Sequence, residues 1–368
     1  MDPLQKIYRL LLLVLVSFVA WIIFPFFSPL ILILVFSFLL TSIFLQPVDY
    51  IEGYVKSRAI GVMVILGVSI TVCTLFIGSF LTNFGYQIKT FSDKIQKDNF
   101  VVSVENLSKK IKLLLPDFFN NLIPESDKII IIAKNFMVNI FQNILALLGS
   151  AGNFLFISFM VLVFTIILLV EYHDFKKSLV RFIPNKFLEI GLRTIYNIEQ
   201  QTSKYLRGQI LAASSVAILS IIGLIILNKS GANITLVLFI GVIAGLANLI
   251  PMVGPFIGMV PAILIALMNN IGNESAITHQ IFNIVPSPFF VLDIILMFIF
   301  VQQLDNNFIT PLVVGESVGL HPMVVMIVLI IGATLIGPIG MLFAIPAAGV
   351  LKVLFREIIF ISKNSHLL

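Results

Sequence analysis

The sequence predicts an all-α membrane protein, a polytopic helical bundle of about eight membrane segments. Of its 368 residues, 59% are hydrophobic and only 11% are charged, whereas soluble domains carry roughly 25% charged residues. The uncharged residues form long runs, several near the ~20 residues that a helix needs to cross a bilayer. A soluble globule needs more surface charge. The composition therefore excludes a soluble enzyme and a nucleic-acid binder, and it makes the lipid bilayer an expected partner.

Three spans are expected at the N-terminus. Residues 10–27 and 29–45 are apolar runs that meet at Pro25 and Pro29, so we expect a membrane hairpin bent at these prolines. Residues 59–82 form a third uncharged run, long enough for a further crossing.

Two charged stretches separate these spans from the rest. In residues 83–134 apolar side chains recur at helical spacing between charged ones, which predicts short amphipathic helices outside the membrane. The fourth span is expected near 147–170. In residues 171–207 an apolar stripe follows Pro184 at helical spacing, which favours a basic helix on the membrane face. An ordinary connecting helix packed on the bundle fits the same stripe.

The chain is therefore expected to divide into four regions. These are an N-terminal three-span unit at 1–82, an extracytoplasmic amphipathic helical segment at 83–146, the fourth span with a cytoplasmic amphipathic helix at 147–207, and a C-terminal transport core at 208–368. The tails and the loops on their side hold nearly all the Lys and Arg of the short loops, whereas those on the other side hold only Lys229. This asymmetry predicts that both termini are cytoplasmic.

Two apolar regions, 235–270 and 323–351, are interrupted near their centres by glycine and proline. Arms of about 13–16 residues are too short to cross a ~30 Å core comfortably, so each region is expected to form a re-entrant or bent hairpin. The preceding spans, 208–227 and 289–305, run in opposite directions, as in an inverted repeat with a transport site near the midplane. Alternatively, the small residues only allow kinks and close packing. The residues expected at the breaks are Pro251, Gly254, Pro255, Gly258, Gly337, Pro338 and Gly340, with Pro311 after the intervening span.

The most unusual polar sequence lies at the cytoplasmic end of the span 289–305. Carboxylates and amides at membrane depth are costly and usually face a bundle interior or a cavity. We expect Asp305 to bind a proton or a small cation there, with amides as neutral oxygen ligands. A merely polar end of the span is the alternative. The candidate transport and coupling residues are Asp305, Asn306, Asn307, Gln302, Gln303, Asn248, Arg207, Gln209 and Glu316.

Several of these motifs resemble those of the autoinducer-2 exporter (AI-2E) family of bacterial transporters. The similar stretches are Asn248 to Pro255, Asp305-Asn306-Asn307 with the following Pro311, and the run from Gly332 through Gly340 to Lys352. The resemblance implies about eight membrane segments, the bacterial cytoplasmic membrane and a homo-oligomer. It also implies export of a small signalling molecule such as autoinducer-2, or exchange of sodium or lithium for protons.

These features favour a bacterial inner-membrane secondary transporter that exports a small molecule or exchanges a cation, coupled to protons or sodium. A passive channel would need the same cavity without alternating states, and a membrane scaffold would need only the extramembrane helices, so both stay open. No catalytic residues, cofactor or metal are expected, because phosphate-loop, zinc-protease and serine-hydrolase motifs are missing and the four histidines lie far apart. The expected partners are lipid, a small-molecule or ion substrate and further copies of the chain, not nucleic acid.

Overall fold

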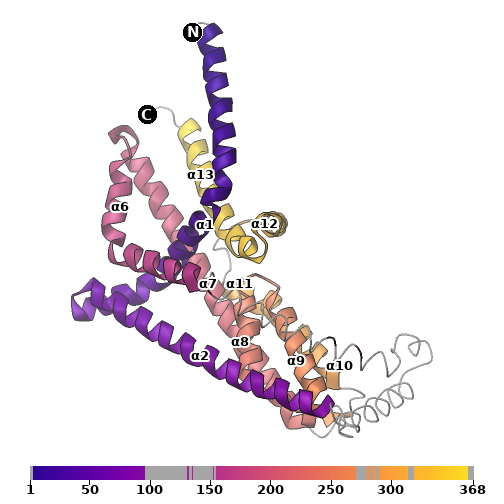
Figure 1. Cartoon of the computed structure of the whole chain (residues 1–368). Helices are drawn as coiled ribbons and strands as arrows, with labels where there is room; N and C mark the ends of the chain where they lie inside the picture. Colours follow the sequence, from indigo (N-terminus) through magenta and orange to yellow (C-terminus); the bar gives the residue numbers. More distant parts are fainter. Residues whose placement is uncertain are drawn as a thin grey trace. The chain divides into compact units, whose positions relative to one another are not determined.

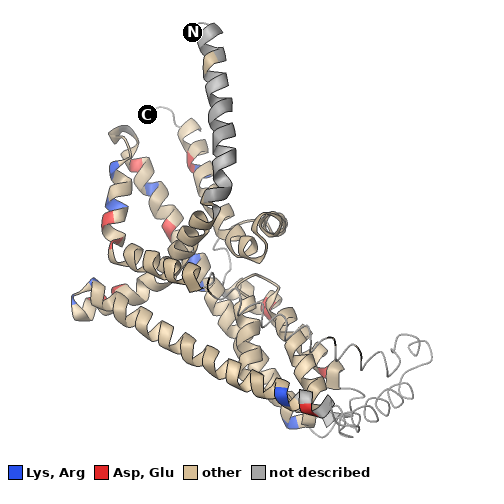
Figure 2. Ribbon diagram, viewed as in Figure 1, with Lys and Arg blue, Asp and Glu red and all other residues tan. Residues whose placement is uncertain are grey.

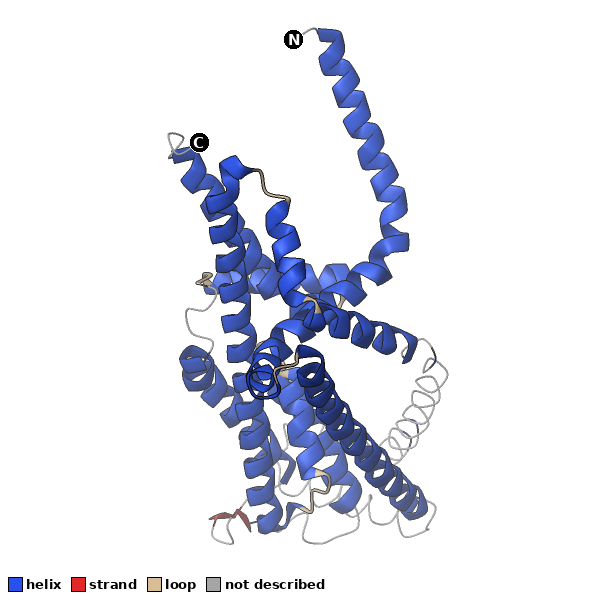
Figure 3. Ribbon diagram, turned by 90° about the vertical axis from the view of Figure 1, so that its left-hand side faces the viewer, coloured by secondary structure: helices blue, strands red, loops and turns tan. Residues whose placement is uncertain are grey.

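The described part of the protein is almost entirely helical (Figure 3). The computed structural model describes residues 3–95, 155–270, 280–281, 285–286, 290–313 and 319–363, with isolated positions at 131, 135 and 152. Side chains are described mainly from Phe27 onward. By their internal contacts, residues 1–69 and 145–182 form one compact unit, and residues 70–144 and 183–368 form a second.

The first unit contains a turn between two long helices, α1 (Pro3–Val55) and α2 (Arg58–Ile95). α1 runs without a break through Pro25 and Pro29, so the hairpin expected at these prolines is wrong. A proline removes one backbone hydrogen bond and kinks a helix. In apolar surroundings a kinked helix still satisfies nearly all of its backbone groups, whereas an open turn would not.

The same unit holds a third helix, Leu155–Val170, which ends as expected for the fourth span. Its Leu169 is fully buried with Val48 of α1 and Val62 and Leu66 of α2. After Glu171 the chain bends by 74° into α6 (Tyr172–Arg181). This apolar cluster therefore joins the α1–α2 turn to the end of the third helix, directly before the bend.

The second unit begins with the remainder of α2, which stays helical to Ile95. The helical spacing expected for the first residues of 83–134 is thus confirmed, and the rest of that stretch lies outside the described residues. After the short helix η1 (Asn185–Phe187), α7 (Leu188–Leu227) is one unbroken helix of 40 residues. The apolar stripe after Pro184 is therefore the first part of α7, packed on α13 (Pro338–Lys363). After Pro184 the chain therefore forms a connecting helix that continues into the expected fifth span, as the alternative of a packed connecting helix describes.

The first broken region is a helical hairpin, α8 (Val237–Ala247) and α9 (Gly254–Asn270) (Figure 1). The chain returns on itself, because Asn270 Nδ2 donates to the carbonyl of Ala232 at 2.7 Å, before the start of α8. That carbonyl belongs to a π-helical segment, η2 (Asn228–Ala232), which ends α7. The break expected around Pro251 and Gly254 is confirmed.

A second hairpin follows the span α10 (Phe290–Leu304). Its helices are α12 (Pro322–Ile336) and α13, which meet at Gly337, whose φ of 68° favours glycine. The break expected at Gly337 and Pro338 is confirmed. The two arms differ more than expected, because α13 has 26 residues against 15 in α12. Lys352 Nζ donates to the carbonyl of Gly319 at 2.7 Å, which ties α13 to the start of the hairpin.

The core of the second unit joins α7, the first hairpin and α10. Its fully or nearly fully buried members include Val216 and Leu224 of α7, Ala244 of α8, Ala262 of α9 and Phe298 of α10. α10 continues into η4 (Asp305–Ile309), a π-helical segment, and α11 (Thr310–Val313). The only strands among the described residues are the two-residue pair β1 (Gln280–Ile281) and β2 (Val285–Pro286).

Among the described residues, five helices are long and apolar enough to cross a membrane, or six if the bent pair Leu155–Val170 and α6 is one span. The helices α8, α9 and α12 are apolar but shorter. An 11-residue helix such as α8 reaches only about 16 Å at 1.5 Å per residue. The protein is therefore a multi-pass helical bundle with both full-length helices and short, broken ones.

Near their ends, α7 and α13 are joined by an ion pair between Arg193 and Glu357. Arg193 Nε donates to Glu357 Oε2 at 3.1 Å, and its Nη2 contacts the same oxygen. Asn197 Nδ2 donates to the other oxygen at 3.2 Å, and the guanidinium lies 4.1 Å from the centre of the Phe360 ring. The Glu357 side chain is 6% exposed and that of Arg193 is 42% exposed.

We expect Arg193→Leu to lower the free energy of unfolding by about 1–3 kcal/mol, because it leaves a buried carboxylate short of its main partner. The loss is smaller than for a fully buried pair because solvent screens the half-exposed guanidinium. Thermal unfolding of the purified full chain in detergent measures the change. Lys204→Leu, which replaces an exposed cation of α7, is the matched control. Equal melting temperatures for the two variants would contradict the stabilising role.

Candidate functional site

Asp305 lies at the centre of a buried polar network in the second unit. Its side chain is 1% exposed. Asn248 Nδ2 donates to Asp305 Oδ2 at 3.2 Å, and the Thr310 hydroxyl donates to Oδ1 at 3.2 Å. Three separate pieces of structure thus meet at one carboxylate: the end of α8, the π-helical segment η4 and α11.

The π-helical segment follows from the proline after Thr310. Pro311 has no N–H, and in an α-helix its ring would clash with the carbonyl four residues earlier. The wider turn of η4 avoids this clash, and the Thr310 N–H bonds to the carbonyl of Asp305 instead. Such π segments within α-helices are frequent at functional sites. Here it brings the Thr310 hydroxyl onto the Asp305 carboxylate.

The break between α8 and α9 places Asn248. Asn248 caps the C-terminus of α8, and its carbonyl accepts a hydrogen bond from Gln209 Nε2 of α7 at 2.5 Å. Gly254, which starts α9, is so close that an added Cβ would lie 2.5 Å from the Asn248 Cβ. A side chain at position 254 would therefore displace Asn248 from the carboxylate. The break thus positions the amide that holds Asp305.

Of the nine candidate residues, the structure brings together three, Asp305, Asn248 and Gln209. Gln302 is also buried, one turn before Asp305, and donates to Asn306 Oδ1 at 2.9 Å. The remaining described candidates lie at the edge of the network or away from it. Asn307 donates to Gln303 on the exposed side of the helix, Arg207 is exposed, and Glu316 lies outside the described residues. Asp305 and Gln302 are thus buried within the protein, whereas Gln303 and Asn307 of the same stretch are exposed.

The side chains of this network include the acceptor types that a proton or a small cation would need. Within the described structure, Asn248 Oδ1 and Gln302 Oε1 are buried without a hydrogen-bond partner, and both are acceptors. A carboxylate with neutral amide oxygens is the donor set that hard cations prefer. Buried acceptors of this kind are costly unless something donates to them or binds to them. Thr310 was missed from the sequence, although its place before Pro311 was the available signal.

A model of the AI-2E family of transporters matches residues 10–360. The chain belongs to the AI-2E family. The match contains both hairpins and the Asp305 network, so the resemblance of the Asn248 and Asp305 motifs to this family is confirmed.

Similar AI-2E proteins occur in bacteria. "Putative transport protein YueF" of Bacillus subtilis (strain 168) is 28% identical over 230 residues, which are 62% of this chain and 56% of that protein. "Putative transport protein YrrI" of the same strain is 32% identical over 179 residues, which are 49% of this chain and 44% of that protein. In each case the match spans about half the length of the relative.

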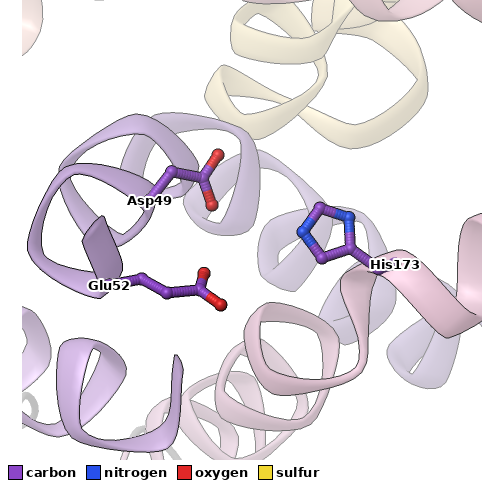
Figure 4. A group of neighbouring side chains, drawn as sticks. All are labelled: Asp49, Glu52 and His173. Carbon is purple, nitrogen blue, oxygen red and sulfur yellow. The ribbon is translucent and has the colours of Figure 1, made fainter. Parts of the chain in front are cut away.

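A second cluster of titratable groups in this AI-2E chain lies in the first unit. Asp49 and Glu52 near the end of α1 and His173 at the start of α6 point toward one another (Figure 4), with ligand atoms within 4.8 Å. Arg58 Nη1 lies 2.9 Å from Asp49 Oδ1, 2.7 Å from Glu52 Oε2 and 3.3 Å from His173 Nε2. The guanidinium thus takes the place that a metal ion would need. We interpret the cluster as an ion-pair clasp.

Proposed function

We propose that this protein is a secondary transporter that exports a small molecule or exchanges a cation, coupled to protons or sodium, with Asp305 as the coupling carboxylate. The observation that carries the proposal is the contact between Asp305 and Asn248. It joins the break of the first hairpin to the π-helical segment that follows α10. Coupling sites of secondary transporters are commonly built at such interrupted helices.

In the proposed mechanism, the two hairpins are the moving elements. Protonation of Asp305, or a cation bound to it, changes which partners the carboxylate can accept. A protonated carboxyl becomes a donor and can satisfy a buried acceptor such as Asn248 Oδ1. Loading and unloading would therefore shift the α8–α9 break relative to η4. The opposed hairpins are proposed to form an inverted repeat, which supplies two states of similar energy.

The proposal places the chain in the bacterial cytoplasmic membrane with both termini cytoplasmic. The excess of Lys and Arg in the short loops of the tail side supports this orientation. A homo-oligomer is part of the proposal through the family resemblance alone.

Flux in proteoliposomes tests the proposed function. We expect uptake of radioactive sodium to saturate and to be driven by an imposed proton gradient, or efflux from a panel of small metabolites to depend on a proton or sodium gradient. Vesicles made with heat-denatured protein are the control for leakage. Flux that stays linear with concentration and ignores both gradients would establish a passive pore instead. Absence of flux under every gradient would favour a scaffold.

A further inference from the structure

α6 has a polar and an apolar side. At 100° per residue, one side of the helix carries the apolar residues Phe175 and Leu179, and Phe182, directly after the helix, continues this side. The opposite side carries His173, Lys177 and Arg181. All three apolar residues are exposed, and none of the residues of α6 is buried. Exposed large apolar residues grouped on one helical face mark an interaction surface.

The direction of α6 decides what this surface faces. Helix Leu155–Val170 is apolar, and α6 departs from it at an angle of 74°. If Leu155–Val170 crosses the bilayer, α6 lies close to the membrane plane. α6 cannot be the second half of the same span, because Lys176, Lys177 and Arg181 would enter the hydrocarbon at high cost.

The clasp around Arg58 fixes the level at which α6 leaves the membrane. Arg58 Nε donates to the carbonyl of Leu169, in the last turn of Leu155–Val170, at 2.5 Å. A cation at a helix C-terminus also satisfies the dipole there. The same guanidinium contacts His173 in the first turn of α6. The charged residues of the α1–α2 turn, Asp49, Glu52 and Arg58, lie at this same point. α6 therefore starts at the boundary between the apolar and the charged parts of this unit.

The net positive charge of α6 is suited to an anionic surface. It carries Lys176, Lys177 and Arg181 against one acidic residue, Asp174, and the charged residues are conspicuous on α6 in Figure 2. The Lys177 ammonium, 2.9 Å from the Asp174 carboxylate, holds the pKa of Asp174 below its usual range. His173, Lys176, Lys177, Val180 and Arg181 line an open hollow of about 640 Å³.

We propose that α6 is an interfacial helix that binds an anionic phospholipid surface, with Phe175, Leu179 and Phe182 among the acyl chains and the basic residues among the headgroups. A helix about 10 Å across lying at this boundary keeps its basic side within a Debye length of the lipid phosphates. An apolar face combined with Lys and Arg is the composition of helices that lie in the membrane interface. Neither the transport site nor the proposed function requires this contact.

Fluorescence of a single tryptophan tests the placement of α6. The full chain has one tryptophan, Trp21, so reporters are made in a Trp21→Phe background. Two reporters lie on the apolar side, Phe182→Trp and Phe175→Trp. Lys177→Trp, on the opposite side, is the matched control. In anionic vesicles with brominated acyl chains, we expect about twofold or stronger quenching at 182 and 175 and much weaker quenching at 177.

Lipid charge gives the second measurement. In the Phe182→Trp background, the double variant Lys177→Gln/Arg181→Gln removes two positive charges from α6. In anionic vesicles, each removed charge should raise the ratio of free to bound α6 by roughly fivefold, and stronger quenching by aqueous acrylamide reports this change. Zwitterionic vesicles should remove the difference between the two proteins. Quenching at 182 by acrylamide but not by bromolipid would place α6 in water. Quenching by neither would show that protein covers the face. Bromolipid quenching that is independent of lipid charge would contradict the anionic preference.

Discussion

Asp305→Asn is expected to abolish gradient-driven flux while leaving the protein folded. The amide keeps the shape of the carboxylate but cannot exchange a proton or neutralise a cation. Its NH₂ group would meet one donor, either Asn248 Nδ2 or the Thr310 hydroxyl, and the hydroxyl can rotate to accept. Because no group at this position can then take up and release a proton or balance a cation, we expect coupled flux to fall to the leak of vesicles made with heat-denatured protein.

Two comparisons make this result specific. Asn307→Ala removes another amide of the same stretch, one that donates to Gln303 on the exposed side of the described helix, so flux should stay near the wild-type value. The melting temperature of Asp305→Asn should equal or exceed that of the wild type, because a buried charge is removed. Coupled flux of Asp305→Asn at the wild-type rate would rule out the carboxylate as the coupling group.

The chemistry of this site could be predicted from the sequence, but its geometry could not. Asp305 and Asn248 stand out because a carboxylate and an amide inside apolar sequence are costly and need a reason to be there. Their contact depends on how the α8–α9 break turns the end of α8, which local sequence does not specify. Thr310 was missed because a lone hydroxyl is unremarkable in a membrane helix. Only the π-helical segment before Pro311 brings it onto the carboxylate.

Helix ends were predicted less well than helix faces. Pro25 and Pro29 suggested a turn, and Pro184 suggested a separate surface helix, yet α1 and α7 both run unbroken through the expected ends. Hydrophobic periodicity reports which side of a helix is buried, but it does not report where the helix stops. The Arg58 clasp was also missed, because it joins residues more than a hundred positions apart, and none of them is unusual alone.

The breaks of the second hairpin were predicted from glycine and proline, but the reason for one glycine is visible only in the structure. An added Cβ at Gly340 would lie 1.9 Å from the carbonyl oxygen of Gly332. Real Cβ atoms do not come so close to a backbone oxygen, and neither backbone is a flexible group that can move aside. The two glycines therefore let α12 and α13 cross with their backbones in contact, as small residues do between membrane helices.

Gly340→Ala is accordingly expected to destabilise the protein by about 3 kcal/mol or more, because overpacking costs about 1–3 kcal/mol even where side chains can shift. Thermal unfolding of the detergent-solubilised full chain measures this loss, together with the yield of monodisperse protein. Gly78→Ala is the matched control, a glycine inside α2 whose added Cβ would meet nothing within 4 Å. There the change should be neutral or stabilising by up to about 1 kcal/mol, since alanine favours the helix.

The same variant distinguishes two roles for the second hairpin. Gly340 lies away from the described contacts of Asp305, so the measurement is the coupled flux of Gly340→Ala per folded molecule. Flux near the wild-type value would mean that the α12–α13 crossing only stabilises the bundle. If the flux of Gly340→Ala per folded molecule is as low as that of Asp305→Asn, the second hairpin moves during transport, as the proposed repeat requires.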